Sequence, residues 1–373
     1  MDERLKFVAR QLADEPLREL SQPRQKALPA PVASPPPGVL HGHRRPLSLG
    51  LDRAPVAPSK ATVPKLWPAF SGERMSILVI GATGFVGGGV TLRLVKRGHR
   101  VTALVRGGGN HEKANALLSA GVEVIGGDLT RPETLALATR NSDTVVCTAT
   151  SMPSAADDGL RRVDHDGVLA LIDAAEQQGI RRFVYVSYSG NIREDSPLET
   201  AKRECENRLL ASKMEAVILR PSFFMEVWFS PALGFDPAVG SARIYGSGEA
   251  KVSYISAANV ADFGLAAATR KYSSKSTILE LGGPEPLSQL DVVRIFEKAL
   301  NKKVKTDQVP VEALQAQHNS SDPLQKTFGA LMLAYSKGDV VDGAGLAQEH
   351  GISLHSVTEF ASSIGKAAEG IIA

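Results

Sequence analysis

The sequence has little of what would place it in several common classes of protein. Its 373 residues include only two cysteines, Cys147 and Cys205, which lack the spacing of a disulfide framework or a metal site. No stretch approaches the roughly 18 to 20 consecutive apolar residues that cross a bilayer, and the N-terminus lacks the apolar run of a secretory signal. We therefore expect two packed thiols in a cytoplasmic protein without a membrane segment or a bound metal.

An excess of charge of one sign is also missing from most of the chain. The formal net charge is +3, but residues 1–74 hold 12 Lys and Arg against 7 Asp and Glu, which leaves 31 against 33 for the rest. The remaining basic cluster, Lys302, Lys303 and Lys305, is typical of a solvated helix end. Because a nucleic-acid-binding protein needs a basic face, we expect no nucleic-acid partner.

Residues 1–74 differ in composition from the rest of the chain. Twelve of the 22 prolines lie there, and residues 21–74 show no apolar period, so we predict a disordered linker in which His41 and His43 are solvated. The first twenty residues, MDERLKFVARQLADEPLREL, carry a helical apolar stripe and resemble the opening helix of the helix-turn-helix region of certain insertion-sequence transposases. No recognition helix follows, so we interpret this extension as the product of a gene fusion or an overextended reading frame.

From Met75 onward, short apolar strands alternate with longer amphipathic helices. Strands are predicted at 76–80, 100–105, 122–126, 143–149, 182–187 and 215–220. This alternation favours an α/β fold with a Rossmann-type, doubly wound parallel sheet, whose ligands bind outside the carboxyl ends of the strands.

The rest of the chain is predicted to complete this core. We predict a nucleotide-binding core over residues 75–230 and a smaller substrate lobe over residues 231–373 that closes the cleft. Ser288 stands where a helix cap is wanted, and the tail beyond residue 310 is expected to pack on the small lobe.

The stretch GATGFVG lies between the first predicted strand and a helix. Gly81 permits the tight turn, Gly84 lets backbone N–H groups approach a pyrophosphate, and Gly87 lets the helix pack close to the strand. A glycine used only for turn geometry is the alternative. The position within a repeating strand-helix unit indicates dinucleotide binding.

Arg106 indicates which dinucleotide is bound. Val105 and Arg106 stand where an acidic residue would accept hydrogen bonds from a free ribose 2′-OH, and a guanidinium can hold a 2′-phosphate there instead. A solvated arginine at a strand end is the alternative. Asp128, in GGDL, is placed to hydrogen-bond the adenine or to cap the helix near Pro132. We therefore expect NADP to be preferred over NAD.

Five motifs in order, GATGFVG, GGDL, RRFVYVSYSG, AVILRPSFFMEVW and YISAANVADFGLAAA, resemble the atypical short-chain dehydrogenase/reductase superfamily, in particular its NmrA-like branch. The resemblance spans roughly residues 76–300. It implies an NADP(H)-binding oxidoreductase that reduces a small electrophilic substrate such as a quinone or an enone. The predicted cofactor contacts are Gly81, Thr83, Gly84, Phe85, Val86, Gly87, Arg106, Asp128, Leu129, Thr148, Ala149, Lys202 and Pro221.

In catalytic members of this superfamily a Ser or Thr, a Tyr and a Lys share the proton chemistry. The resemblance places Ser189 at the hydroxyl position and Lys202 at the lysine position, but Leu198 stands where the tyrosine belongs. Three interpretations stay open. The protein is a reductase that uses Lys202 or the cofactor geometry alone, or a redox sensor, regulator or assembly factor that binds NADP and acts through a protein partner, or Tyr188 replaces the missing tyrosine.

A group of apolar side chains follows the last strand predicted for the core. These residues form either a wall for a planar or apolar substrate or ordinary core. They are Phe223, Phe224, Met225 and Trp228.

Overall fold

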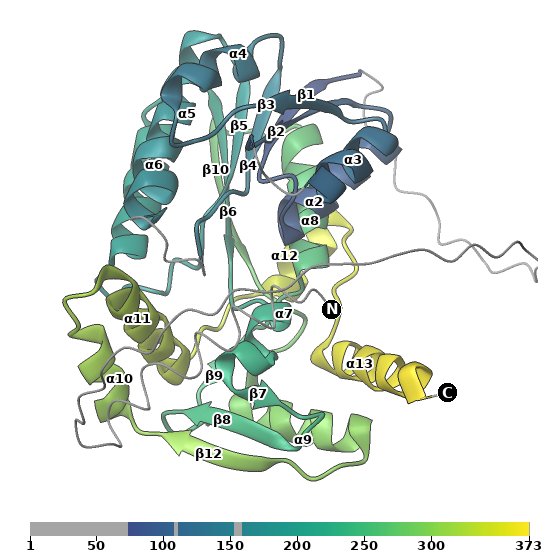
Figure 1. Cartoon of the computed structure of the whole chain (residues 1–373), viewed down its shortest axis with the longest axis vertical. Helices are drawn as coiled ribbons and strands as arrows, with labels where there is room; N and C mark the ends of the chain where they lie inside the picture. The colour runs from purple at the N-terminus through teal and green to yellow at the C-terminus, as the bar shows by residue number, and fades with distance from the viewer. Residues whose placement is uncertain (1–73, 108–110, 153–158, 373) are drawn as a thin grey trace, which may run out of the picture.

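The computed structural model describes residues 74–372, apart from 108–110 and 153–158. Its centre is a seven-stranded parallel sheet in the order β10-β6-β5-β4-β1-β2-β3 (Figure 1). The order reverses between β1 and β4, which is where Rossmann-type sheets bind their ligands. The interpretations of residues 1–20, His41 and His43 lie outside the described residues.

All six predicted strands are confirmed, each within two residues at either end. The seven strands of the main sheet are β1 (Ser76–Ile80), β2 (Arg100–Val105), β3 (Glu123–Gly126), β4 (Thr144–Cys147), β5 (Arg182–Val186), β6 (Glu215–Pro221) and β10 (Ser276–Leu281). The seventh strand, β10, lies outside the predictions. It pairs only with β6, and Ile278 is 41% exposed, so this edge strand lacks the continuous apolar pattern of a fully buried one.

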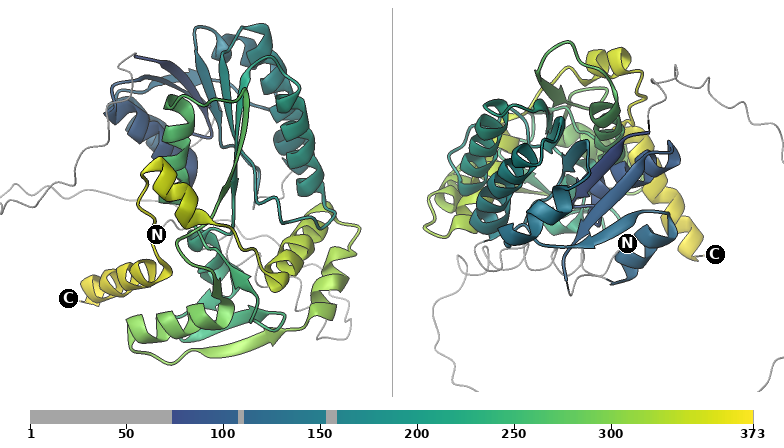
Figure 2. Two further views of the ribbon diagram at one scale, coloured as in Figure 1. Left: turned by 180° about the vertical axis from the view of Figure 1, so that it is seen from behind. Right: turned by 90° about the horizontal axis from the view of Figure 1, so that it is seen from above.

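Helices cover both faces of the main sheet, as the two further views show (Figure 2). Along β1, Ile77 and Val79 point into one core and Leu78 and Ile80 into the other, because successive side chains of a strand face opposite ways. One face is covered by α2 (Phe85–Lys96), α3 (His111–Ser119), α8 (Ala257–Thr269) and α12 (Gly343–His350). The other is covered by α4 (Leu135–Thr139), the π-helical segment η3 (Leu160–Gly167), α5 (Val168–Gln177) and α6 (Pro197–Leu210).

A second, smaller body lies beyond the carboxyl end of β6 (Figure 1). Its strands form a three-stranded sheet, β7 (Phe235–Asp236), β8 (Ser241–Tyr245) and β12 (Lys305–Val309), and a pair, β9 (Lys251–Val252) and β11 (Leu287–Ser288). Its helices are α7 (Met225–Trp228), α9 (Gln289–Leu300), α10 (Val311–His318), α11 (Pro323–Lys337) and α13 (Val357–Ile372). Phe229, Phe296 and Tyr335 belong to its core. The cap predicted at Ser288 is confirmed, since its side chain accepts a hydrogen bond from the Asp291 N–H and the Asp291 carboxylate accepts one in return.

The chain after residue 231 serves both bodies. Leu314 of α10 and Phe328 of α11 pack in the small body, as expected for the tail, but Ala347 of α12 packs in the main sheet's core. Since β10 belongs to the main sheet and α8 packs against one of its faces, a cut at residue 230 would divide this part of the structure. The separation of the chain into two folding units stays a prediction.

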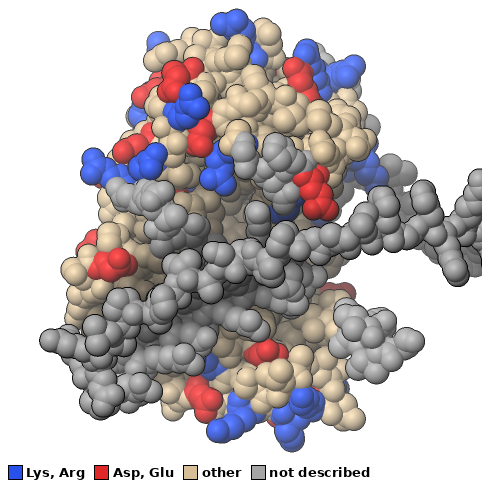
Figure 3. Space-filling model, viewed as in Figure 1, with Lys and Arg blue, Asp and Glu red and all other residues tan. Residues whose placement is uncertain are grey.

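The surface of the described residues carries charges of both signs. On the face in Figure 3, basic and acidic side chains are interspersed and do not gather into a field of one sign. Within the described ranges, none of the helices combines the length and the apolar character that a membrane crossing requires.

Candidate nucleotide-binding site

The loop after β1 brings backbone groups unusually close together. Gly81 has φ of +87°, a backbone conformation that is strained for residues with a side chain. Its carbonyl accepts a hydrogen bond of 2.9 Å from the Gly84 N–H. A Cβ on Gly87 would lie 2.2 Å from the Gly81 carbonyl oxygen and 2.5 Å from Thr148 Oγ1. The two glycines therefore allow α2 to start directly against the ends of β1 and β4.

The N-terminus of α2 is open for an anion. The helix begins at Phe85 with Gly84 as its N-cap, without a side-chain cap and without an acidic residue in its first turn. First-turn N–H groups and the helix dipole favour a phosphate at such a position. Phe85 is 59% exposed, whereas Val86 packs against the core beneath. This geometry is what the glycine pattern predicts.

Two basic side chains lie near this loop. Lys113, in the first half of α3, donates from Nζ to the carbonyl oxygen of Thr83 at 3.1 Å. Arg106 follows directly on β2, is exposed, and makes no ion pair with another described residue. Lys113 was not predicted as a site residue. Its signal in the sequence is a lysine near the start of the helix that follows the second strand.

Three further predicted cofactor contacts, Asp128, Leu129 and Thr148, lie at the same edge of the sheet. Their side chains make contacts within the protein. The Asp128 carboxylate accepts hydrogen bonds from the Thr130 N–H and hydroxyl, so it closes its own turn and does not cap the helix near Pro132. The Leu129 side chain is 5% exposed and packs in the core. Thr148 donates to the Ile80 carbonyl.

Two further predicted contacts, Ala149 and Pro221, lie near the carboxyl ends of β4 and β6. Ala149, directly after Thr148, packs against the core on the α5 and α6 face. Pro221 is buried, and its carbonyl accepts a hydrogen bond from the Ser189 N–H. Whether these residues contact a nucleotide stays a prediction.

Lys202 is held in a nearly closed environment on α6. It is 5% exposed, its Nζ lies 3.5 Å from the carbonyl oxygen of Val186 at the end of β5, and it lies 5.1 Å from the centre of the Tyr185 ring. Its charged partner is Asp164, fully buried in η3, with Oδ1 at 3.7 Å from Nζ. The other oxygen of Asp164 accepts hydrogen bonds from the N–H and hydroxyl of Ser151. Asp164 was not predicted. Its only signal is the acidic VDHDG segment that leads into a helix.

The two cysteines near Lys202 are packed thiols, as expected. Burial raises the pKa of the Cys147 thiol to about 11 and that of the Cys205 thiol to about 12, although the Lys202 charge opposes both shifts. Neither thiol is a nucleophile near neutral pH, because the thiolate is the reactive form.

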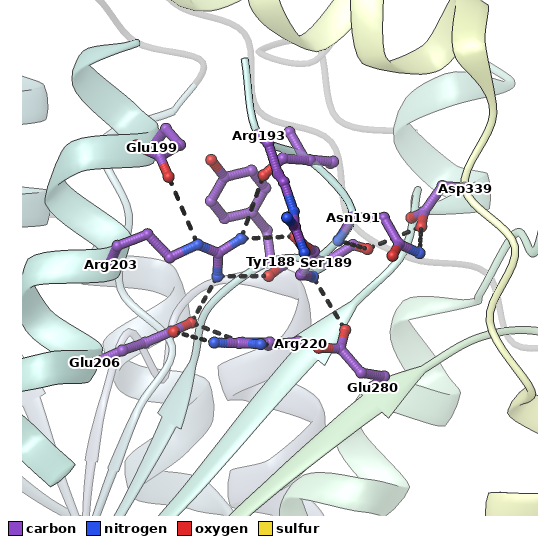
Figure 4. A network of polar contacts seen from close by, with 12 residues as sticks. Tyr188, Ser189, Asn191, Arg193, Glu199, Arg203, Glu206, Arg220, Glu280 and Asp339 are labelled. Carbon is purple, nitrogen blue, oxygen red and sulfur yellow. Dashed lines mark hydrogen bonds and ion pairs between the residues drawn. The ribbon is translucent and has the colours of Figure 1, made fainter. Parts of the chain in front are cut away.

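The hydroxyl of Ser189 is occupied within the protein (Figure 4). Ser189 is fully buried and donates from Oγ to Asp339 Oδ1 at 2.8 Å, and the Asn191 side-chain amide donates to the same oxygen. Asp339 follows α11 in the second body. The Ser189 hydroxyl proton is therefore donated to Asp339, which was not predicted because it lies 150 residues away.

Tyr188, the alternative proton donor, packs against a charged side chain. Its ring packs against the Arg203 guanidinium, with Cζ at 4.7 Å from the ring centre (Figure 4). Burial raises the pKa of the Tyr188 phenol, and the Arg203 charge only partly opposes this. At the tyrosine position itself, Leu198 is 7% exposed. Whether Tyr188 takes the place of the missing tyrosine stays a prediction.

Glu206 is the centre of the ion-pair network in Figure 4. It is 2% exposed, contacts Arg203 at 2.8 Å and receives two hydrogen bonds from Arg220. Arg220 also pairs with Glu280 on β10, whose carboxylate accepts from the Gly190 N–H. The network thus ties the carboxyl ends of β5, β6 and β10 to α6.

The apolar residues after β6 are mostly core. Phe223, Met225 and Trp228 are each 8% exposed or less and belong to the core of the second body. The centre of the Trp228 ring lies 4.1 Å from the centre of the Tyr335 ring and 4.7 Å from the centre of the Phe223 ring. Phe224 is half-buried and packs against the core of the main sheet. A substrate wall formed by these four residues stays a prediction.

The sheet order, the glycine-rich loop and the open helix N-terminus define a Rossmann-type α/β protein. The sequence profile of the NmrA-like family matches residues 73–340, and the chain belongs to that family. The resemblance seen in the five sequence motifs is thereby confirmed.

Individual relatives differ in what they do. Photosystem II assembly factor Ycf39 of Trieres chinensis is 32% identical over 247 residues, which cover 65% of this chain and 74% of that protein. Divinyl chlorophyllide a 8-vinyl-reductase of Zea mays is 27% identical over 317 residues, which cover 80% and 77%. The NADPH complex of a quinone oxidoreductase from Escherichia coli has a TM-score of 0.64 at 21% identity and covers 77% of this chain and 99% of that one. This last likeness shows the fold alone.

Replacing Gly87 tests the close approach of α2. Gly87→Ala should destabilise the protein by about 1 to 3 kcal/mol and weaken dinucleotide binding, because the added methyl group collides with the Gly81 carbonyl. Urea unfolding and a binding titration measure both effects. Gly126→Ala is the control, since a Cβ there meets nothing within 4 Å. Equal behaviour of the two variants would contradict the role given to Gly87.

Glu206 should make stability depend on acid pH. Burial acts to raise the pKa of Glu206, but hydrogen bonds from Arg220 and the charges of Arg203 and Arg220 lower it below 4.5. Its contribution is therefore present above the unfolded-state value and is lost as pH falls through the lower folded-state value.

Glu206→Gln should cost on the order of 3 kcal/mol at pH 7. In urea unfolding, the gap between this variant and the unchanged protein should narrow as the pH falls below about 4.5. Glu199→Gln, which removes only a 3.8 Å pair with Arg203, should change little. A gap that stays constant with pH would show that the carboxylate charge does not matter.

Proposed function

We propose that this protein is an NADPH-dependent reductase that acts on a small electrophilic acceptor such as a quinone or an activated enone. The observation that carries the proposal is the buried Lys202, held by Asp164 beside the ends of β4 and β5. A buried ammonium at this edge stabilises negative charge on a bound ribose or on a reduced acceptor.

NADPH, when bound, supplies the hydride. The N-terminus of α2 would bind the pyrophosphate through its N–H groups, and Arg106 would pair with the 2′-phosphate. Lys113 donates to the Thr83 carbonyl oxygen and so adds positive charge beside the glycine-rich loop. These basic groups favour NADP over NAD, which lacks the additional phosphate.

The leucine that stands at the tyrosine position narrows the choice of acceptor. Leu198 cannot transfer a proton, and the Ser189 hydroxyl is bound to Asp339. Quinones and activated enones delocalise the charge of their reduced forms, so they depend least on a protein acid. Lys202 would stabilise that charge while the proton comes from the ammonium or from water.

A second candidate is an NADP-binding assembly factor that acts through a protein partner. The similarity to Ycf39, named as a photosystem II assembly factor, favours it. The occupied Ser189, the missing tyrosine and the burial of most of the supposed substrate wall are also compatible with binding without turnover. In this case the nucleotide would report the redox state to the partner.

Cofactor preference tests the first step of the proposal. The protein should bind NADP(H) more tightly than NAD(H), and Arg106→Ala should narrow the gap, because a charged contact with the 2′-phosphate contributes about 1.5 to 3 kcal/mol. Calorimetric or fluorescence titration measures the affinities. Arg100→Ala, at the opposite end of β2, should leave them unchanged. Equal affinities for both cofactors in the unchanged protein would refute the preference.

Turnover separates the two candidate functions. If the protein is a reductase, a panel of quinones and enones should give acceptor-dependent oxidation of NADPH, and Lys202→Met should lower kcat by more than it weakens NADPH binding, because it removes stabilisation of transition-state charge. Lys213→Met, on an exposed lysine beyond α6, is the control. An assembly factor would show nucleotide binding but no acceptor-dependent oxidation, and that result would decide for the second candidate.

A further inference from the structure

Asp164 is a fully buried carboxylate in an unusual segment of helix. It is 0% exposed and lies in η3, a π-helical run of eight residues, LRRVDHDG. Widened helical turns of this kind are rare and often occur at functional sites. A buried carboxylate is costly unless hydrogen bonds or an opposite charge compensate for it. The contacts of its two oxygens therefore indicate the role of the Asp164 carboxylate.

The two oxygens of Asp164 face different parts of the candidate site. Oδ2 accepts from the Ser151 N–H at 2.8 Å and from the Ser151 hydroxyl at 2.5 Å, which ties it to the segment after β4. Oδ1 makes no hydrogen bond with another described residue and lies 3.7 Å from Lys202 Nζ. At that distance the pair is held by charge, and the N–H groups of the ammonium remain available to Val186 and to a ligand.

The other titratable groups around Lys202 carry no charge near neutral pH. Tyr185 on β5, Cys147 on β4 and Cys205 on α6 face it from the remaining elements. Burial raises the pKa of all three, and that of Tyr185 well above its ordinary value. Among the described residues, Asp164 is thus the one anion within ion-pair distance of Lys202.

We propose that Asp164 is the positioning residue of this site, which keeps Lys202 charged and oriented toward the nicotinamide ribose. The inference rests on the proposed binding of NADP(H). Through Ser151, the same carboxylate also fixes the segment after β4, so one buried group sets both the charge and the wall of the ribose subsite. Without the carboxylate, a buried ammonium favours loss of its proton or movement toward solvent.

The test is the pH dependence of NADPH binding in Asp164→Asn. The asparagine keeps the shape and the bonds with Ser151 but removes the charge. From pH 7 to 9.5, the affinity of the unchanged protein should stay nearly constant, whereas that of the variant should fall about tenfold and recover on return to pH 7. A merely structural role for Asp164 would weaken binding equally at every pH.

Asp166→Asn is the matched control. Asp166 lies two residues further along the same π-helical segment, but its side chain is 52% exposed and it pairs with Arg161 and His165 at the surface. Its substitution should leave the pH profile of NADPH binding as in the unchanged protein. A profile that changes equally in both variants would assign the effect to the helical segment and overturn the role of Asp164.

A second pair of variants keeps the inference testable if Asp164→Asn alone does not fold. Lys202→Met combined with Asp164→Asn removes both buried charges and should restore folding. If Asp164 acts through Lys202, the double variant should bind NADPH as well as Lys202→Met alone. A further loss of affinity would overturn the inference. If the unchanged protein did not bind NADPH, the proposed function and this inference would both be overturned. If the NADPH affinity of Asp164→Asn did not depend on pH, the inference alone would be overturned.

Discussion

The burial of both faces of the parallel sheet is the constraint on which the rest of the structure depends. Helices cover each face, so side chains pointing up and down from strands such as β1 must be apolar. The buried ion pairs described above therefore lie at or beyond the ends of the strands. At the carboxyl ends, the glycine-rich loop, the Lys202–Asp164 pair and the Glu206 network lie along one edge of the sheet, and this edge carries the candidate chemistry.

The two halves of that edge are stabilised differently. Near β1 and β2 the site is made of backbone and surface charge, with an uncapped helix N-terminus and an exposed Arg106. Near β5, β6 and β10, polar side chains are paired within the protein, as Ser189 is with Asp339 and Glu206 with Arg220. The first half is suited to accept a phosphate-bearing ligand without rearrangement. The second half rigidifies the junction with the smaller body, and little of its polar capacity is left for a substrate.

This division bears on why one family can hold both reductases and assembly factors. Under the proposed function, the first half of the edge binds the pyrophosphate and the 2′-phosphate, whereas a reduction would also need a group that stabilises charge beside the acceptor. Under the proposed function, that group is the buried Lys202 with its carboxylate partner Asp164.

By itself, the sequence determined six of the seven strands of the main sheet, the glycine-rich turn and the cap at Ser288, because each depends on a local period or on residues a few positions apart. Only the tertiary structure decided that Phe223 and Trp228 are core, that Ser189 is bound by Asp339, and that Asp164 faces Lys202. Those contacts join segments far apart in the chain, and the 150 residues between Ser189 and Asp339 carry no local pattern that relates them. Their meeting follows from how helices and loops pack on the sheet.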